Sequence, residues 1–253
     1  MCLLAIHYQI LTEAPILVAA NREEFFDRVS HSPRIEAQRP RVLCGQDERA
    51  GGTWLGVNEH GLFVAVTNRK KTSLPEQPRS RGTLCRELLN CRTAADASRL
   101  AETELASRRY AGANFVALDA LAGFVVHGGD RLEILPLAPG LHLLTNGDLN
   151  DPRDARQRFA RELFSAQPIG ASGEFLDVAA RVCATGPDPV RGTTIVLRGD
   201  NRGTVSSTLV ALTTRSGDVA YRHAAGPPDR TAFEDYSRSL QEILCEGASG
   251  SSS

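Results

Sequence analysis

Two short apolar runs joined by a proline-bearing turn open the chain and constrain its fold more than any other feature. The first run covers residues 2–8 and the second covers residues 16–20, with Pro15 just before the second. Short, β-rich runs joined by such a turn are typical of a β-hairpin. The hairpin would return the polar residues 21–24 to the side of the chain start.

The hairpin brings five chemically active side chains toward one place. They are a thiol, an amide, a guanidinium and two carboxylates, at Cys2, Asn21, Arg22, Glu23 and Glu24. If the initiator methionine is removed, Cys2 carries the free α-amine, whose ordinary pKa of about 8 suits a general base. An N-terminal nucleophile that uses its own amine needs no histidine partner. The simpler alternative is that Cys2 is a buried thiol that begins a strand, because cysteine is among the most buried residue types.

Composition excludes several classes of partner. The chain has 253 residues, of which 42% are hydrophobic, and a formal net charge of -1. This length fits one large domain or two small ones, and the charge gives no reason to expect nucleic acid or an anionic membrane as partner. No apolar run is long enough for a transmembrane segment. No basic segment precedes the first apolar run, so we expect no signal peptide.

The cysteines and histidines indicate a reducing compartment and no metal site. The six cysteines form no CxxC pair and show no disulfide-framework spacing. In a chain of this length they are typical of reduced, mostly buried thiols in a cytoplasmic protein. The six histidines are scattered without metal-ligand spacing, so a structural zinc site is not expected.

The order of the expected elements favours an α+β fold. After the hairpin come strands, two helices, strands, two helices, strands and a last helix, which fits antiparallel sheets covered by helices. The expected strands cover residues 42–45, 53–58, 62–67, 114–118, 123–127, 132–135, 141–145, 194–197, 207–212 and 219–221, and the four from 114 to 145 form one meander. The expected helices cover residues 84–91, 94–107 after the N-cap Thr93, 152–166 after the N-cap Asp151, 175–184 and 232–245.

Other stretches are expected to be turns or irregular. Residues 25–38 are expected to form an ordered loop, and the basic, proline-bearing residues 69–81 a mobile surface loop. Residues 59–61 form a tight turn in which Gly61 suits a positive φ angle. Residues 247–253 are small and polar, so we expect a disordered tail.

Three expected strands end in asparagine after a small residue, at Asn21, Asn68 and Asn146. Asparagine is poor inside a strand, so each one alone is more often a turn residue than a functional one. Together they can line one end of a sheet, where side-chain amides donate hydrogen bonds to an oxyanion.

Several motifs carry a family resemblance over nearly the whole chain. They are the start Met1-Cys2 and residues 20–25, 51–58, 67–68, 80–82, 145–146 and 203–208, of which Gly-Gly-Thr-Trp-Leu-Gly in residues 51–56 is the most specific. This pattern resembles the Asn-Arg-Asp-Glu family, which is the family of the transport and Golgi organisation 2 protein. Residues 58–68 are also remotely similar to the cysteine-type N-terminal nucleophile hydrolases, the group of penicillin V acylase and bile salt hydrolase.

The second resemblance implies a fold and a site. The fold is an αββα sandwich of two stacked antiparallel sheets between helical layers, which we expect to form a single domain over residues 1–246. Cys2 is then the nucleophile, and Asn146 with the backbone around Asn68 donates to the oxyanion. Asn21 and Glu24 match the positions that hold the amine and the thiol, with Arg22 between them in the same cluster.

Two residues depart from the family pattern. The third residue of the Asn-Arg-Asp-Glu motif is Glu23 here, which keeps the charge of the family aspartate but moves it by one methylene. Val205 stands where the family segment has an arginine. If that arginine binds a substrate carboxylate or steadies the thiolate, its role is lost or passes to Arg202 or Arg191, which are near in sequence.

Two functions from different classes fit these features. The first is a cysteine N-terminal nucleophile that hydrolyses an amide bond, or transfers the acyl group, of a small acylated molecule, with no cofactor required. The second is a non-catalytic carrier that holds haem, an acyl lipid or an acyl thioester in the same pocket, as the family resemblance implies. A single histidine is enough to hold haem, and His31 is the first choice. Trp54 is expected in the core or the pocket wall, and Arg202 near the substrate.

Overall fold

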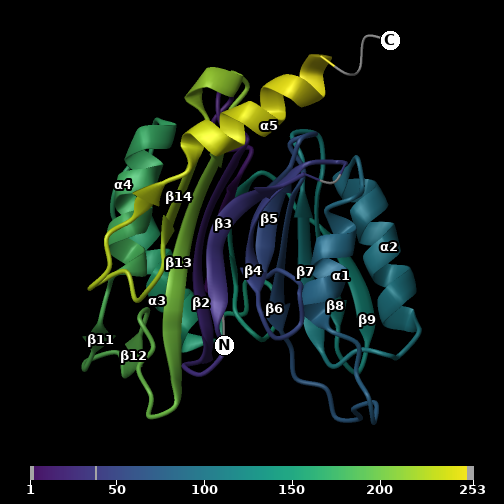
Figure 1. Cartoon of the computed structure of the whole chain (residues 1–253). Helices are drawn as coiled ribbons and strands as arrows, with labels where there is room; N and C mark the ends of the chain where they lie inside the picture. Colours follow the sequence, from purple (N-terminus) through teal and green to yellow (C-terminus); the bar gives the residue numbers. More distant parts are fainter. Residues whose placement is uncertain (1–2, 38, 250–253) are drawn as a thin grey trace. The chain divides into compact units, whose positions relative to one another are not determined.

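The computed structural model describes residues 3–37 and 39–249, which divide into two compact units. Among the described residues, unit 1 combines residues 3–27 with 139–237, and unit 2 combines residues 28–138 with 238–249. Each unit has one large antiparallel sheet with helices against it (Figure 1). The α+β class is therefore confirmed. No helix in the described part of the chain is long and apolar enough to cross a membrane.

The sheet of unit 1 is built around the N-terminal hairpin. Its strand order is β10-β1-β2-β13-β14-β15, and all neighbours are antiparallel. The strands are β1 (Leu3–Tyr8), β2 (Ile16–Phe25), β10 (Gly140–Leu144), β13 (Arg202–Leu212), β14 (Ala220–Ala224) and β15 (Glu234–Asp235). A separate short pair is formed by β11 (Pro187–Asp188) and β12 (Thr193–Thr194), and a 3-10 turn, η1, covers Ser216–Asp218. The predicted pairing of β1 with β2 is confirmed.

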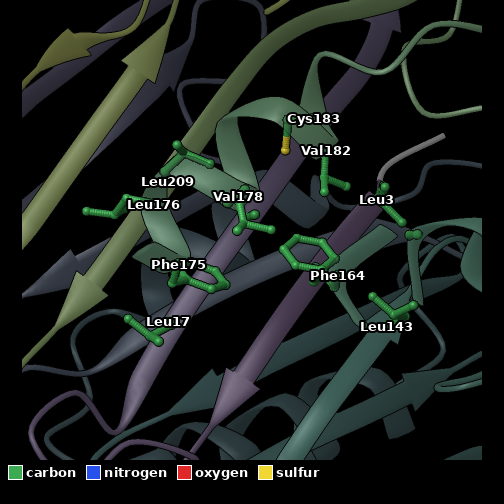
Figure 2. Close-up of a cluster of buried hydrophobic side chains, with 14 of the residues drawn as sticks. Leu3, Leu17, Leu143, Phe164, Phe175, Leu176, Val178, Val182, Cys183 and Leu209 are labelled. Atoms are coloured by element: carbon green, nitrogen blue, oxygen red, sulfur yellow. The ribbon is translucent and has the colours of Figure 1, made fainter. Parts of the chain in front are cut away.

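Two amphipathic helices cover one face of this sheet. They are α3 (Ala155–Ser165) and α4 (Ser172–Cys183). Figure 2 shows Phe164 and Phe175 of these helices above Leu17 of β2, and the two rings stack with their centroids 6.0 Å apart. Because side chains alternate along a strand, Leu17 shares its face with Asn21 and Glu23, while residues 20, 22 and 24 lie on the other face. The helix-covered face is therefore apolar for most of its length and polar at one end.

The sheet of unit 2 runs in simple sequence order, from β3 to β9. Its strands are β3 (Ser30–Glu36), β4 (Val42–Asp47), β5 (Leu55–Asn58), β6 (Phe63–Asn68), β7 (Ala113–Leu118), β8 (Gly123–Gly128) and β9 (Leu132–Pro136). The helices are α1 (Arg81–Leu88), α2 (Ala94–Ala106) and α5 (Ser237–Ser249). Buried Leu84 and Leu88 of α1 and Ala97 and Ala101 of α2 pack with strand residues such as Phe115 in one core.

Several local predictions for unit 2 are confirmed. Gly61 has a φ of 76° in the tight turn between β5 and β6. Thr93 caps α2, because its hydroxyl accepts a hydrogen bond from the backbone N–H of Asp96 at 3.1 Å. These features depend on a few adjacent residues, and such short-range patterns are readable from sequence.

The expected ordered loop at residues 25–38 is in part a strand, and the expected mobile loop at residues 69–81 is hydrogen-bonded to other segments. Residues 30–36 form β3, whose pairing with β4 is interrupted by a bulge between His31 and Arg34. Pro33 lies in this irregular part, and proline in a sheet is confined to edges and bulges, which hid the strand from the sequence pattern. The basic segment is bonded at several points: Arg69 N–H donates to Gly112 O at 2.9 Å, and Lys71 Nζ donates to Tyr110 O at 3.0 Å.

The predicted four-stranded meander is wrong in its last strand. β7, β8 and β9 follow one another in unit 2, but β10 pairs with β1 in unit 1. The apolar residues 141–145 can complete either sheet, and the edge of β1 is the one they pair with. The Asp151 N-cap was also wrong, since Asp154 caps α3 by accepting from the N–H groups of Arg156 and Gln157.

Two further boundaries differ near the C-terminus. The expected strand 194–197 is reduced to β12, because Val196 N–H bonds Thr185 O in place of a sheet partner. The last helix begins at Ser237, since residues 234–235 form β15, and it continues to Ser249. It therefore extends three residues into the expected tail, whose residues 250–253 lie outside the described residues.

The Gly-Gly-Thr segment of unit 2 makes a very close backbone contact with α1. A Cβ placed on Gly52 would lie 2.2 Å from the carbonyl carbon of Gly82 and 2.3 Å from the nitrogen of Thr83. Thr53 N–H also donates to Gly82 O at 3.0 Å. Only glycine fits this contact, because a backbone cannot move aside as the end of a flexible side chain can.

We expect Gly52→Ala to lower the free energy of unfolding by about 2 kcal/mol or more, because the added methyl group overpacks a backbone contact. Urea denaturation measures the change. Gly186→Ala is the matched control, since a Cβ at Gly186 meets no atom within 4 Å. Equal effects of the two substitutions would show that the contact is not tight in solution.

Candidate functional site

The register of β1 places the motif residues beside the start of the chain. Leu3 is opposite Asn21 on β2, and Leu4 is opposite Leu144 on β10. Thr145 and Asn146 follow β10 directly, so both neighbours of β1 deliver polar side chains to the end at which β1 begins. The predicted nucleophile Cys2 lies outside the described residues and immediately precedes Leu3 in the sequence.

A group of buried polar residues occupies this end of the helix-covered face. We call it the helix-side polar cluster, and its members are Asn21, Glu23, Thr145, Arg156 and Gln157. Asn21 and Glu23 lie on β2, and Thr145 directly follows β10. Arg156 and Gln157 lie in the first turn of α3. Each is less than a tenth exposed, so their hydrogen bonds have to be made inside the protein.

Asn21 uses its amide nitrogen to hold two segments that are distant in sequence. Asn21 Nδ2 donates to the carbonyl oxygen of Cys183 at 2.9 Å and to that of Ile195 at 3.5 Å. Cys183 is the last residue of α4, and Ile195 directly follows β12. The Oδ1 atom of Asn21 is buried and accepts no hydrogen bond from the described residues. Its amide group therefore offers an acceptor at the chain-start end of the sheet.

Glu23 and Arg156 form a buried ion pair. Arg156 Nη2 lies 2.5 Å from Glu23 Oε1, and the two side chains are 8% and 0% exposed. The same nitrogen donates to Ile195 O at 2.5 Å. Burial raises the pKa of Glu23, and the adjacent Arg156 charge opposes this rise. The longer side chain of Glu23, compared with the family aspartate, is thus engaged with an arginine of α3.

Thr145 and Gln157 connect the cluster to the cap of α3. Gln157 Nε2 donates to Thr145 Oγ1 at 3.2 Å and to Asp148 O at 2.9 Å. Thr145 Oγ1 donates to Asp154 Oδ2 at 2.5 Å. The residue before Asn146 is therefore fixed to the helix that carries Arg156, which restrains the position of the predicted oxyanion donor.

The opposite face of the same strands carries Arg22 and Glu24. Their side chains are 7% and 19% exposed, with Arg22 Nη2 4.0 Å from Glu24 Oε2. Glu24 Oε1 also accepts from the N–H of Phe25 at 3.0 Å. On β14, the buried His223 ring bonds Thr208 Oγ1 through Nδ1 at 2.9 Å, and burial lowers the pKa of His223 to about 4. The motif therefore divides its charged groups between the two faces of the sheet.

Val205 lies at an irregularity in the pairing of β13 with β2. Thr204 is opposite Glu23 and Ser206 is opposite Arg22, so one extra residue is inserted between them. Such a β-bulge bends the strand and changes the direction of a side chain. The position at which the family has an arginine is therefore at a special backbone site, and here it carries an uncharged side chain.

The two suggested replacements for that arginine are not buried in the cluster. Arg202 is exposed and lies opposite Phe25 at the start of β13. Arg191 is bound to Glu162 and Asp188, at 2.9 Å and 2.7 Å. The buried cations near the neighbours of Val205 are Arg22, which lies opposite Ser206, and Arg156. Arg156 pairs with Glu23, the partner of Thr204. Sequence reasoning missed it, although it shares the buried face of α3 with Phe159 and Ala160.

The remaining predicted site residues belong to unit 2. Asn68 ends β6, opposite Ala113, and is partly buried. The Trp54 ring packs on Gly45, where an added Cβ would lie 2.4 Å from it, so Trp54 is a packing residue of unit 2. His31 lies in β3 and not in a loop, and its ring is half exposed, 3.9 Å from Glu48.

One thiol of unit 1 also lies at this end of the sheet. Cys183 ends α4 and is buried, and burial raises the pKa of its thiol to about 12. The Ser207 hydroxyl, which donates to Ala20 O at 3.1 Å, lies beside it. A thiol with so high a pKa stays protonated near neutral pH, so Cys183 is a packing residue and not a nucleophile.

Comparison with solved structures identifies the fold. Penicillin V acylase from Agrobacterium tumefaciens gives a TM-score of 0.52 with 14% sequence identity, over 94% of this chain and 87% of that one. The Caenorhabditis elegans ortholog of N-acylethanolamine-hydrolyzing acid amidase gives 0.53 with 13% identity, over 82% and 92%. At such identities the likeness shows the fold alone. The fold is that of the N-terminal nucleophile hydrolases.

The sequence identifies the family. The profile of the Transport and Golgi organisation 2 family matches residues 1–168, and the chain belongs to this family. The human Transport and Golgi organization protein 2 homolog is 33% identical over 158 residues, which are 59% of this chain and 56% of that protein. The Bos taurus homolog is 32% identical over 157 residues, with the same shares. The chain spans about half the length of the curated relatives it matches.

We expect Glu23→Gln to lower the free energy of unfolding by about 3 kcal/mol, because it leaves the Arg156 charge buried without its partner. Replacing both residues by leucine should recover much of this loss, since no buried charge then remains. Urea denaturation of the single and double variants measures the coupling. Arg99→Gln, which removes an exposed ion pair with Asp96, is the control and should change stability by less than about 1 kcal/mol. A loss no larger than that of the control would contradict a structural role for the pair.

We expect acid to destabilise the protein partly through His223. Its pKa is about 4 in the folded protein and about 6.5 in an unfolded chain, so the unfolded state binds a proton first as the pH falls. The stabilisation is complete above pH 6.5 and is lost progressively toward pH 4. Between pH 7 and 4.5, wild type should lose about 2 kcal/mol more than His223→Gln. His60→Gln, at an exposed histidine, should match wild type at both pH values.

Proposed function

We propose that this protein is an N-terminal nucleophile enzyme that cleaves the amide bond of a small acylated molecule, or transfers its acyl group, with Cys2 as nucleophile. The observation that carries the proposal is the register of unit 1. Leu3, the residue after Cys2, lies opposite Asn21, and the segment ending in Asn146 continues from the strand on the other side of β1. The resemblance to the cysteine-type N-terminal nucleophile hydrolases implies a chain-terminal nucleophile at this end of the strand. Membership of the family and the fold likeness support the same proposal.

In the proposed reaction, removal of Met1 frees the α-amine of Cys2. The amine takes the thiol proton while the Cys2 sulfur attacks the substrate carbonyl carbon, and the carbonyl π electrons move to oxygen as a tetrahedral intermediate forms. The C–N bond then breaks, and the departing amine takes the proton from the α-ammonium. Water hydrolyses the resulting thioester to a carboxylic acid, or a second amine accepts the acyl group. No cofactor is required in either route.

The residues of unit 1 have distinct proposed roles. Asn146 donates its amide N–H to the developing oxyanion, and its position is restrained by Thr145, which is bonded to the cap of α3. Asn21 Oδ1, which accepts nothing from the described residues, is an acceptor for the α-amine. Arg22 and Glu24, 4.0 Å apart, hold charge on the other face of the same strand. The role of the Asn68 backbone as second oxyanion donor stays a prediction, as do substrate roles for Trp54 and Arg202.

A carrier is the second candidate, and one observation favours it. The bulge at Val205 bears no cation at the position where the family has an arginine, and a site that only binds its ligand needs no group to steady a thiolate. Under this alternative the protein holds haem, an acyl lipid or an acyl thioester without turning it over. His31 is half exposed on β3 and stays the proposed haem ligand.

We expect incubation with a panel of acyl amides to add an acyl mass to wild-type protein and none to Cys2→Ala, with turnover lower by at least about 10³-fold in that variant. Asn146→Ala should form the adduct about 10²-fold more slowly, because one oxyanion donor is lost, while Asn90→Ala should match wild type. Intact-protein mass spectrometry reports both the adduct and the removal of Met1. A retained Met1 in protein that turns over substrate would exclude the amine mechanism. Absence of any adduct, with a saturable haem absorption shift lost in His31→Ala, would favour the carrier.

A further inference from the structure

Unit 2 has a hollow that the proposed reaction does not use. It measures about 420 Å³, and four separate segments line it: the β5–β6 turn, the residues just before α2, the β7–β8 turn and α5. A volume of this size is within the range of small-ligand sites. All of its lining residues belong to unit 2.

Both carboxylates at the hollow are already engaged by the protein. Asp119 Oδ2 accepts from Ala94 N–H at 2.7 Å, and its Oδ1 accepts from the N–H groups of the next turn at 2.8 Å each. Glu59 Oε2 accepts from Arg41 N–H at 3.0 Å and lies 3.6 Å from Arg41 Nε. The oxygens of Asp119 therefore already have backbone donors, and Glu59 lies beside the Arg41 charge, so neither acid lacks hydrogen-bond partners inside the protein.

The basic groups at the hollow are not engaged in this way. Arg92 and His60 are both exposed. Neither side chain forms an ion pair or hydrogen bond with any other residue in the described ranges, and Arg92 is charged at all physiological pH values. The hollow thus has one permanent positive charge available, and a guanidinium is well suited to bind a carboxylate in a bidentate manner.

Apolar side chains complete the lining. Leu121 is 91% exposed, an unusual position for leucine, and the Asp119 hydrogen bonds fix the turn that presents it. Leu244 of α5 lies on another side, and a Cβ at Gly61 would be 4.0 Å from its Cδ2 atom. The positive φ of Gly61 keeps the turn free of a side chain at this point. The hollow therefore combines two leucines with one available arginine.

We propose that this hollow binds a medium-chain carboxylate, with the carboxylate on Arg92 and the alkyl chain along Leu121 and Leu244. Hydrogen-bonding capacity selects an anion, because both acids already accept hydrogen bonds within the protein, whereas the N–H donors of Arg92 have no partner in the described ranges. The leucines select an alkyl chain over a fully polar anion such as phosphate. The site belongs to unit 2 and does not depend on the proposed chemistry of Cys2.

Titration of the full chain with octanoate, followed by two-dimensional amide NMR, tests the site. We expect saturable shifts of the amides around Arg92, Leu121 and Leu244. Octylamine should cause no such shifts, and inorganic phosphate none either. Arg92→Gln should weaken octanoate binding about tenfold or more, because a hydrogen-bonded charge is lost. Leu121→Ser should also weaken it, and this variant should fold normally because the side chain is exposed.

Two matched variants serve as controls. Arg131→Gln removes another exposed arginine of unit 2, one that lies in the β8–β9 turn away from the hollow, and Val190→Ser removes an equally exposed apolar side chain of unit 1. Both should bind octanoate as wild type does. Octylamine binding as well as octanoate, unchanged affinity in Arg92→Gln, or shifts spread over the whole surface would each overturn the proposal.

Discussion

The antiparallel pairing of β1 with β2 is the constraint on which unit 1 depends. All six residues of β1 are buried, and β10 and β13 pair with the outer edges of these two strands. A slip of one residue would exchange the two faces of β2, so that Arg22 would point at the helices and Glu23 away from them. Arg156 would then be buried without its carboxylate. Residues 16–20 of β2 are apolar and buried on both faces, so the buried pair of Glu23 with Arg156 at the end of the strand is what specifies the register.

Features encoded by a few neighbouring residues could be read from the sequence. The hairpin, the Thr93 cap and the Gly61 turn each depend on a short pattern with one physical cause. The family motifs added the fold, which composition and periodicity alone left as antiparallel sheets covered by helices. In the site, the placement of Asn21 beside the start of β1 also followed, since it depends on the hairpin alone, whereas the placement of Asn146 depends on the pairing of β10 with β1.

Features set by competition between distant segments could not be read in this way. Residues 141–145 suit either sheet by their pattern, and they pair with β1 of unit 1 and not with β9 of unit 2. The pairing of Arg156 with Glu23 joins residues 133 positions apart, and an arginine on a helix is usually a surface residue. The sequence did contain one indication that Arg156 is buried, because it lies three residues before Phe159 and so on the same, apolar face of α3. The strand β3 was hidden by Pro33 and its polar neighbours, whose order comes from β4.

The close contact at Gly52 joins two motifs that are separate in the sequence. The Gly-Gly-Thr segment and the start of α1 are about thirty residues apart, yet their backbones touch at Gly82. Because Gly52 has no Cβ atom, α1 can lie this close to the sheet of unit 2. A relative that carries any side chain at this position would need a differently seated α1, so these two motifs can change only together.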